Sequence, residues 1–186
     1  MDKPKKITKR GPLAERYQSS EESAEAAKRR ARQAQQEEEA RSALHQEDRQ
    51  RTSHRLKVWL HNGALSVEGA STFFLRGWDI GASEGRLRLL EPGSLLRLSF
   101  TNTTEHALVV LRLNHLSYGL EGGGHSPIAI TLNKQGAAKE VNPPRDYYAT
   151  ERFDLSAFVK AGENALEITL GQATSPYWLE SLELLY

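Results

Sequence analysis

The stretch that decides the fold runs from Phe153 to Leu170 and reads FDLSAFVKAGENALEITL. Asp154 stands where a short helical turn would be capped, and Gly162 and Asn164 suit a tight turn. The residues that follow alternate between apolar and polar, which is the period of a half-buried strand. A capped turn, a tight turn and a strand in this order indicate a β-sandwich.

The rest of the chain after residue 55 shows the same two-residue period. Asn62 and Gly63 supply the positive φ angles of a two-residue hairpin. The run 107–116 begins apolar on both faces, which predicts a central strand. Phe158 is expected to close one end of the core, so Phe158→Ala should cost about 3–5 kcal/mol. Regular spacing without long helical patterns favours an all-β antiparallel sandwich. We expect strands at 56–61, 64–69, 72–75, 86–90, 95–100, 107–116, 128–132, 166–170 and 177–184.

The composition changes near residue 55. Residues 1–55 carry 14 Lys and Arg against 10 Asp and Glu, which leaves 11 against 14 in residues 56–186. Tyr17 is the only aromatic residue before position 56, so the core must come from the later part. The absence of cysteine excludes disulfides and thiolate metal sites. No apolar run follows the basic start or approaches the length of a membrane span, so we expect a soluble, cytoplasmic protein.

Residues 1–55 fall into two parts, a basic tail and a charged arm. Residues 1–18 hold two prolines and a basic cluster at Lys3–Arg10, so we expect a disordered tail that is either solvated or in contact with nucleic acid. Ser19 and Glu22 have the spacing of a capping box, and good helix formers follow, which predicts a charged helical arm over 19–55. A coiled coil would need larger apolar residues than its alanines. The arm is therefore a solvated spacer, or a helix that docks on a protein partner through its alanine stripe.

Three segments of the later part resemble the galactose-binding-domain-like jelly roll. They are IAITLN at 128–133, the stretch 153–170 quoted above and YWLESLEL at 177–184. The resemblance covers residues 56–186 and is strongest over 107–186. This is the fold of many carbohydrate-binding modules and of sugar-binding domains attached to glycoside hydrolases. The resemblance therefore implies an antiparallel jelly-roll β-sandwich with a binding role.

The positions that carry the resemblance are structural. Asp154 matches a cap, and Gly162 and Asn164 match turn residues, so they bring no binding site with them. Family members that hold calcium usually carry acidic residues near both the first and the last strand. Here the first strand has no acid, and Glu180 and Glu183 are the only acids near the last. We therefore expect no cofactor, and a structural calcium ion has no support in the sequence.

Sugar binding needs an aromatic face against the sugar ring and polar groups for its hydroxyls. The predicted loops between residues 76 and 148 hold both kinds of side chain. Trp78 suits a binding site and a core position equally well. The three glycines at 122–124 predict a flexible loop in preference to a ligand-binding loop. The candidate ligand-binding residues are Trp78, Asp79, Tyr118, His125, Arg145, Asp146 and Tyr147.

An enzyme is disfavoured by the same sequence. The six histidines lack metal-ligand spacing, and nothing places Asp79, Glu84 and Asp146 together as a catalytic carboxylate pair. The loop aromatic residues favour a noncatalytic carbohydrate-binding module. The arm favours an intracellular adaptor or assembly protein, in which the sandwich is a protein-docking surface and the helix binds a partner. Both hypotheses stay open at this point.

Overall fold

The computed structural model describes residues 12–61, 64–79, 87–89, 91–104, 107–117, 126–141, 148–173 and 175–186. The chain divides into two compact units, Met1–Glu47 and Asp48–Tyr186. Helix α1 (Pro12–Arg51) supplies the described part of the first unit, and its last turn belongs to the second. The second unit therefore begins at Asp48, earlier than the boundary at residue 56 that the sequence predicts.

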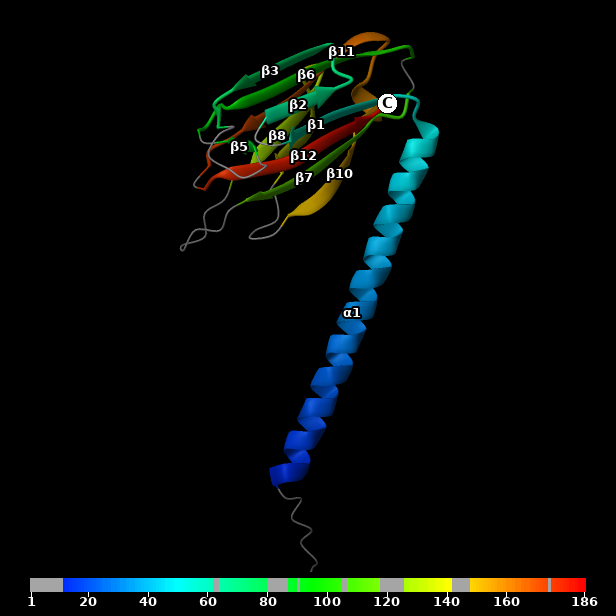
Figure 1. Ribbon diagram of the computed structural model, residues 1–186, viewed down its shortest axis with the longest axis vertical. Helices are drawn as coiled ribbons and strands as arrows, with labels where there is room; N and C mark the ends of the chain where they lie inside the picture. The colour runs from blue at the N-terminus through cyan, green and yellow to red at the C-terminus, as the bar shows by residue number, and fades with distance from the viewer. Residues whose placement is uncertain are drawn as a thin grey trace, which may run out of the picture. The chain divides into compact units, whose positions relative to one another are not determined.

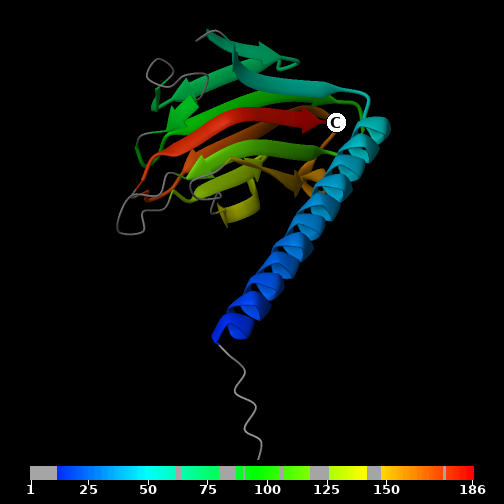
Figure 2. The ribbon, with the colours of Figure 1, turned by 60° about the horizontal axis from the view of Figure 1, so that its bottom comes forward.

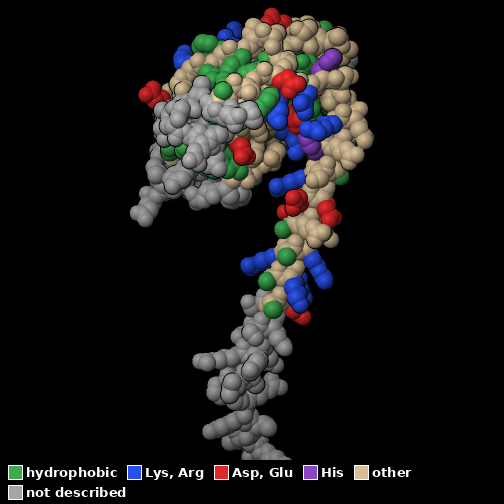
Figure 3. Space-filling model, in the orientation of Figure 1, with side chains coloured by type: hydrophobic (Ala, Val, Ile, Leu, Met, Phe, Trp, Pro, Cys, Tyr) green, Lys and Arg blue, Asp and Glu red, His purple; other side chains and the backbone are tan. Residues whose placement is uncertain are grey.

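Helix α1 confirms the predicted helical arm but begins before Ser19, at Pro12. Proline is well tolerated at the first helical position because its missing N–H would have no partner there. The predicted disordered tail therefore overlaps the helix from Pro12 onward, and residues 1–11 lie outside the described residues. Described side chains from Ala24 to Leu44 are exposed, and charged groups lie along the helix (Figure 3). Glu25 and Arg29, four residues apart, form an ion pair at 3.8 Å in which both side chains are exposed.

Among the described residues, the strands of the second unit form two antiparallel sheets (Figure 1). The strands are β1 (Arg55–His61), β2 (Ala64–Glu68), β3 (Thr72–Arg76), β4 (Trp78–Asp79), β5 (Leu87–Leu89), β6 (Leu95–Asn102), β7 (Val110–Ser117), β8 (Ile128–Leu132), β9 (Gln135–Val141), β10 (Ala149–Asp154), β11 (Gly162–Leu170) and β12 (Tyr177–Leu185). The seven-stranded sheet has the order β10-β7-β12-β1-β2, with β5 beside β12 and β4 beside β5. The five-stranded sheet has the order β3-β6-β11-β8-β9. This confirms the all-β antiparallel prediction.

The core lies between the two sheets, which face each other in both ribbon views (Figure 2). Strand β11 buries Leu166, Ile168 and Leu170 on one face, as its alternating sequence predicts. Strand β8 buries alternate residues in the same way, and β12 does so on either side of its register shift, whereas β6 buries residues on both faces. Because consecutive strands from β6 to β12 mostly cross between the sheets, the topology is that of a jelly roll.

Strands β9 and β10, like the two-residue strand β4, were absent from the sequence prediction, which left residues 134–152 irregular. Strand β9 has small and charged residues without alternation, and its pairing with β8 shifts register twice. Strand β10 is the edge strand of its sheet, where no strict alternation of burial is required. Both strands form because neighbouring strands supply hydrogen-bonding partners. This contribution cannot be read from the sequences of β9 and β10 themselves.

The tight turns follow local residue chemistry. His61 pairs with Ala64, so two residues join β1 and β2 as predicted, although Asn62 and Gly63 themselves lie outside the described residues. Leu132 pairs with Gln135, and Asn133 and Lys134 between them have φ angles of 55° and 66°. Both angles are positive, as a two-residue hairpin of type I′ requires.

The N-cap of the short helix is Leu155, which makes no side-chain capping hydrogen bond, so the predicted cap is replaced by a local turn at Asp154. Oδ1 of Asp154 accepts hydrogen bonds from the backbone N–H of Ser156 at 3.0 Å and from the Ser156 hydroxyl at 2.6 Å. These two bonds lower the pKa of Asp154 below its ordinary value. They hold the chain in position for the short helix η1 (Ser156–Phe158).

Phe158 packs against the core as predicted but is only half-buried. We therefore expect Phe158→Ala to lower the free energy of unfolding by about 2 kcal/mol, near the lower end of the range for large-to-small core changes. Urea unfolding followed by tryptophan fluorescence measures this change. A loss as large as that of Phe100→Ala, which removes a fully buried ring, would contradict the half-buried assignment.

The last turn of α1 is attached to the seven-stranded sheet by an ionic cluster. Arg152 on β10 donates two hydrogen bonds to the carboxylate of Asp48, at 2.8 and 2.9 Å. Arg49 donates to Glu183 on β12 at 3.0 Å, and Arg55 on β1 lies 3.9 Å from the same carboxylate. No described helix is both long and apolar enough to cross a membrane.

Candidate functional site

Strand pairing brings described residues of β4, β5, β7, β10 and β12 together at one end of the seven-stranded sheet. Tyr177 at the start of β12 pairs with Ser117 at the end of β7 and, on its other side, with Leu89. Leu89 pairs in turn with Trp78 on β4, and Ala149 at the start of β10 pairs with His115. We call this the loop end, marked by Asp79, Ser117, Tyr148 and Tyr177. The candidate residues Tyr118, His125, Arg145, Asp146 and Tyr147 lie outside the described residues, in segments that begin or finish at these strand ends.

Trp78, His115 and Tyr177 pack together below the loop end, and we call this cluster the floor. The Trp78 ring is half-buried against the core, and the ring N–H donates to the carbonyl of Leu95 at 3.0 Å. The ring also meets Tyr177 edge to face, with 6.5 Å between centroids. The preceding Gly77 has a φ of 73°, and a Cβ there would lie 2.3 Å from Oγ of Ser94. These contacts give Trp78 a packing role, while Asp79 follows it in β4 opposite Arg88.

A buried histidine forms the centre of the floor. His115 Nδ1 lies 3.1 Å from the hydroxyl of Tyr177, and Nε2 lies 3.0 Å from a carboxylate oxygen of Glu151. The carboxylate can only accept, so Nε2 carries the hydrogen and Nδ1 accepts the Tyr177 hydroxyl. His115 and Tyr177 are fully buried. Both ring nitrogens of His115 and the hydroxyl of Tyr177 have hydrogen-bond partners. These satisfied bonds hold the two buried side chains in fixed positions.

Burial moves both pKa values of this pair away from neutrality. Loss of solvent lowers the pKa of His115, although the charge of Glu151 and its hydrogen bond act in the opposite direction. Burial likewise raises the pKa of the Tyr177 hydroxyl well above its ordinary value. The two groups therefore keep their neutral forms around pH 7.

This network makes folding stability depend on pH. The pKa of His115 is lower in the folded chain than its value of 6.5 without burial, so the unfolded chain binds the proton first. The stabilisation is complete above pH 6.5 and is lost as the pH falls below it. We expect the loss to be at most about 1.4 kcal/mol per pH unit. Urea unfolding at several pH values between 5 and 7.5, compared with His115→Gln, measures it; equal pH dependence in both proteins would contradict this account.

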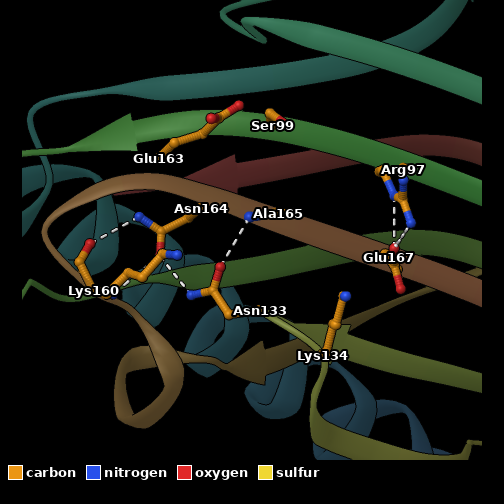
Figure 4. Close-up of a pocket in the computed structure, with 9 residues that line it drawn as sticks. All are labelled: Arg97, Ser99, Asn133, Lys134, Lys160, Glu163, Asn164, Ala165 and Glu167. Atoms are coloured by element: carbon orange, nitrogen blue, oxygen red, sulfur yellow. Dashed lines mark hydrogen bonds and ion pairs between the residues drawn. The ribbon is translucent and has the colours of Figure 1, made fainter.

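A second candidate site is a polar groove on the outer face of the five-stranded sheet (Figure 4). Its volume is about 480 Å³. Two amide side chains form one wall: Asn133 donates to Oδ1 of Asn164 at 2.7 Å, and its own Oδ1 accepts from the N–H of Ala165 at 3.1 Å. We call Asn133 and Asn164 the asparagine pair. The groove is lined by Arg97, Ser99, Asn133, Lys134, Lys160, Glu163, Asn164, Ala165 and Glu167.

The charged residues that line the groove are one ion pair and three further charged side chains. Arg97 on β6 and Glu167 on β11 are paired strand partners, and the Arg97 Nε donates to the Glu167 carboxylate at 2.6 Å. Lys134, Lys160 and Glu163 also line the groove, and all three are exposed. Sequence reasoning missed these charged residues, because exposed lysine and glutamate are ordinary on any surface. The only available signal was Lys134 in a turn position that favours glycine.

The acids near the last strand have protein partners. Glu180 accepts a hydrogen bond from the side-chain amide of Asn114, and Glu183 lies beside Arg49 and Arg55. Within the described part of the chain, no three histidine or acidic side chains are grouped so that they could hold a metal ion.

Comparisons with known proteins add a distant likeness in fold. No family model matches the chain, and no curated protein matches it. Among solved structures, the CBM35 from Cellvibrio japonicus Abf62 is 14% identical, with 72% of this chain and 94% of that chain covered and a TM-score of 0.46. The CBM36-1 domain of a multidomain xylanase from the hindgut metagenome of Trinervitermes trinervoides is 9% identical, with 70% and 96% covered and a TM-score of 0.46. A family two carbohydrate esterase from Cellvibrio japonicus is 16% identical, with 71% and 33% covered and a TM-score of 0.40. At these scores the likeness says nothing about what the chain binds.

Proposed function

We propose that the sandwich is a noncatalytic carbohydrate-binding module whose site lies at the loop end. The observation that carries this proposal is the convergence of strand ends. Ser117 ends β7 beside Tyr177, and Ala149 begins β10 opposite His115, so the segments that hold the predicted loop residues adjoin neighbouring strand ends. Two tyrosines, a histidine, an arginine and an aspartate in these segments supply aromatic faces and hydroxyl partners for a sugar.

The floor under these segments supports binding without catalysis. Trp78, His115 and Tyr177 hold one another through ring packing and hydrogen bonds, so the strand ends are fixed in position. Fixed strand ends reduce the entropy that a loop loses when it binds a ligand. The ionisable groups of His115 and Tyr177 are fully buried, so these described groups cannot reach a substrate.

A glycan array probed with the full chain tests the proposal, followed by calorimetry on any glycan retained. We expect Tyr118→Ala and Tyr147→Ala each to weaken binding about tenfold, because each removes an aromatic face. Phe74→Ala is the matched control, since Phe74 is half exposed and lies on β3 of the other sheet. Trp78→Ala is unsuitable because it also disrupts the floor. A silent array, or equal losses for Phe74→Ala, would contradict the proposal.

A second candidate function is protein docking through α1, as in an adaptor. The observation that favours it is the full exposure of the described side chains from Ala24 to Leu44. Ala24, Ala27, Ala31 and Ala34 are spaced three and four apart, so they share one helix face. A partner that is captured by the full chain and lost with Ala27→Glu and Ala31→Glu would support docking. Capture unchanged by these substitutions would contradict it.

A further inference from the structure

Lys134 occupies a backbone conformation that lysine disfavours. It follows Asn133 in the hairpin between β8 and β9, with a φ of 66°. Glycine is the preferred residue at this second turn position, because a Cβ crowds the backbone at positive φ. Residues held in such conformations concentrate at functional sites. The side chain of Lys134 lines the groove on the five-stranded sheet, which indicates a role for its ammonium group there.

Lys160 reaches the same groove from a different turn. Its backbone N–H donates to Oδ1 of Asn164 at 3.0 Å, and its carbonyl accepts from Nδ2 of Asn164 at 2.8 Å. Asn164 is bonded in turn to Asn133, the neighbour of Lys134. The hydrogen bonds of the asparagine pair (Figure 4) therefore fix the backbone near both lysines, whose side chains are exposed.

The electrostatics of the groove favour an anion. Arg97 is neutralised by Glu167, and within the described residues neither Lys134 nor Lys160 has a carboxylate within ion-pair distance. Glu163 is the remaining acid of the lining, so the groove carries one excess positive charge. Small side chains at Ser99 and Ala165 leave space between the charged groups.

We propose that this groove binds a tetrahedral oxyanion, a phosphate or sulfate group, between Lys134 and Lys160. An ammonium group is a compact point charge with three donors, so two of them suit the spread oxygens of a tetrahedral anion. The Ser99 hydroxyl can donate to a third oxygen. The anion can be free in solution or attached to a saccharide, and the experiment separates these sources. The proposal stands apart from the loop end, which belongs to the other sheet.

Nuclear magnetic resonance of the ¹⁵N-labelled full chain at low ionic strength tests this proposal. The probes are inorganic phosphate, inorganic sulfate, N-acetylglucosamine 6-sulfate and unsulfated N-acetylglucosamine. We expect saturable shifts of the Lys134, Lys160 and Ala165 amides with the anionic probes and none with the neutral sugar. Tighter binding of the sulfated sugar than of sulfate assigns the site to a saccharide, and equal binding assigns it to the anion alone. Shifts confined to the basic residues before Ser19, or no saturable shift, would overturn the proposal.

Variants of the groove separate binding from folding. Lys134→Gly relieves the positive φ angle, so the thermal midpoint should stay the same or rise while anion affinity falls about fivefold. Lys160→Gln should weaken binding by a similar factor, and Glu163→Gln should strengthen it. Lys57→Gln on β1 of the other sheet is the matched control and should change nothing. Wild-type affinity in the double variant of Lys134 and Lys160 would overturn the proposal.

Discussion

Asn164→Ala is expected to lower the free energy of unfolding by about 4 kcal/mol, because it leaves several polar groups without partners. Asn164 is fully buried. Its Oδ1 accepts from Asn133 and from the N–H of Lys160, and its Nδ2 donates to the carbonyls of Lys160 and Gly162 at 2.8 and 3.0 Å. Each buried group left unpaired costs about 1–3 kcal/mol, and water reaches some of them from the groove. Urea unfolding measures the change.

Two further substitutions separate hydrogen bonding from turn geometry. Asn164→Asp keeps the shape but turns a carboxylate oxygen toward the carbonyls of Lys160 and Gly162, so it should destabilise the chain more at pH 7 than at pH 4. Gly162→Ala tests the turn alone, since Gly162 has a φ of 89° and open space around it. We expect it to cost about 1 kcal/mol. If Asn164→Ala lowered the free energy of unfolding no more than Gly162→Ala, the hydrogen bonds of Asn164 would not stabilise this turn.

The asparagine pair also shows how far the sequence predicts the fold. Gly162 and Asn164 are recognisable as turn residues, and the alternation from Leu166 to Leu170 predicts a strand with a buried face. The same logic succeeds for β1, β2, β6, β8 and β12. It fails for β9 and β10, because their sequences lack a regular alternation of apolar and polar residues. The bond between Asn133 and Asn164 joins two turns far apart in sequence, which no local pattern reveals.

The candidate sites were predictable to different degrees. Aromatic and polar residues in turn-rich segments predict a binding site there, and strand register places the described ends of β7, β10 and β12 side by side. Trp78 was ambiguous in the sequence, because a tryptophan beside glycine suits both a site and a core. Its hydrogen bond to Leu95 and its contact with Tyr177 give it a packing role. The sequence did not predict the groove proposed to bind an oxyanion, because its charged residues lie on separate strands and turns.

The ionic cluster at the end of α1 is the other place where a single substitution should have a large effect. Asp48 is 1% exposed although it is charged, and Arg152 meets its carboxylate with two hydrogen bonds. Lys, Arg, Asp and Glu side chains gather on this part of the sandwich (Figure 3). Thr52 also donates to the carbonyl of Asp48 at 2.8 Å. The last turn of α1 is therefore held by polar contacts, where an unpaired charge is costly.

Arg152→Leu is expected to lower the free energy of unfolding by about 3 kcal/mol, because the buried Asp48 carboxylate loses its bidentate partner. Adding Asp48→Leu should recover most of this loss, since replacing both charges with apolar groups of similar size removes the unpaired carboxylate. Arg29→Leu is the matched control, because its pair with Glu25 at 3.8 Å is exposed and should contribute less than about 1 kcal/mol. Unfolding in urea of the wild type, Arg152→Leu, Asp48→Leu and the double variant gives the coupling between Asp48 and Arg152 directly. Additive losses in the double variant would mean that the pair does not hold the last turn of α1 against the sheet.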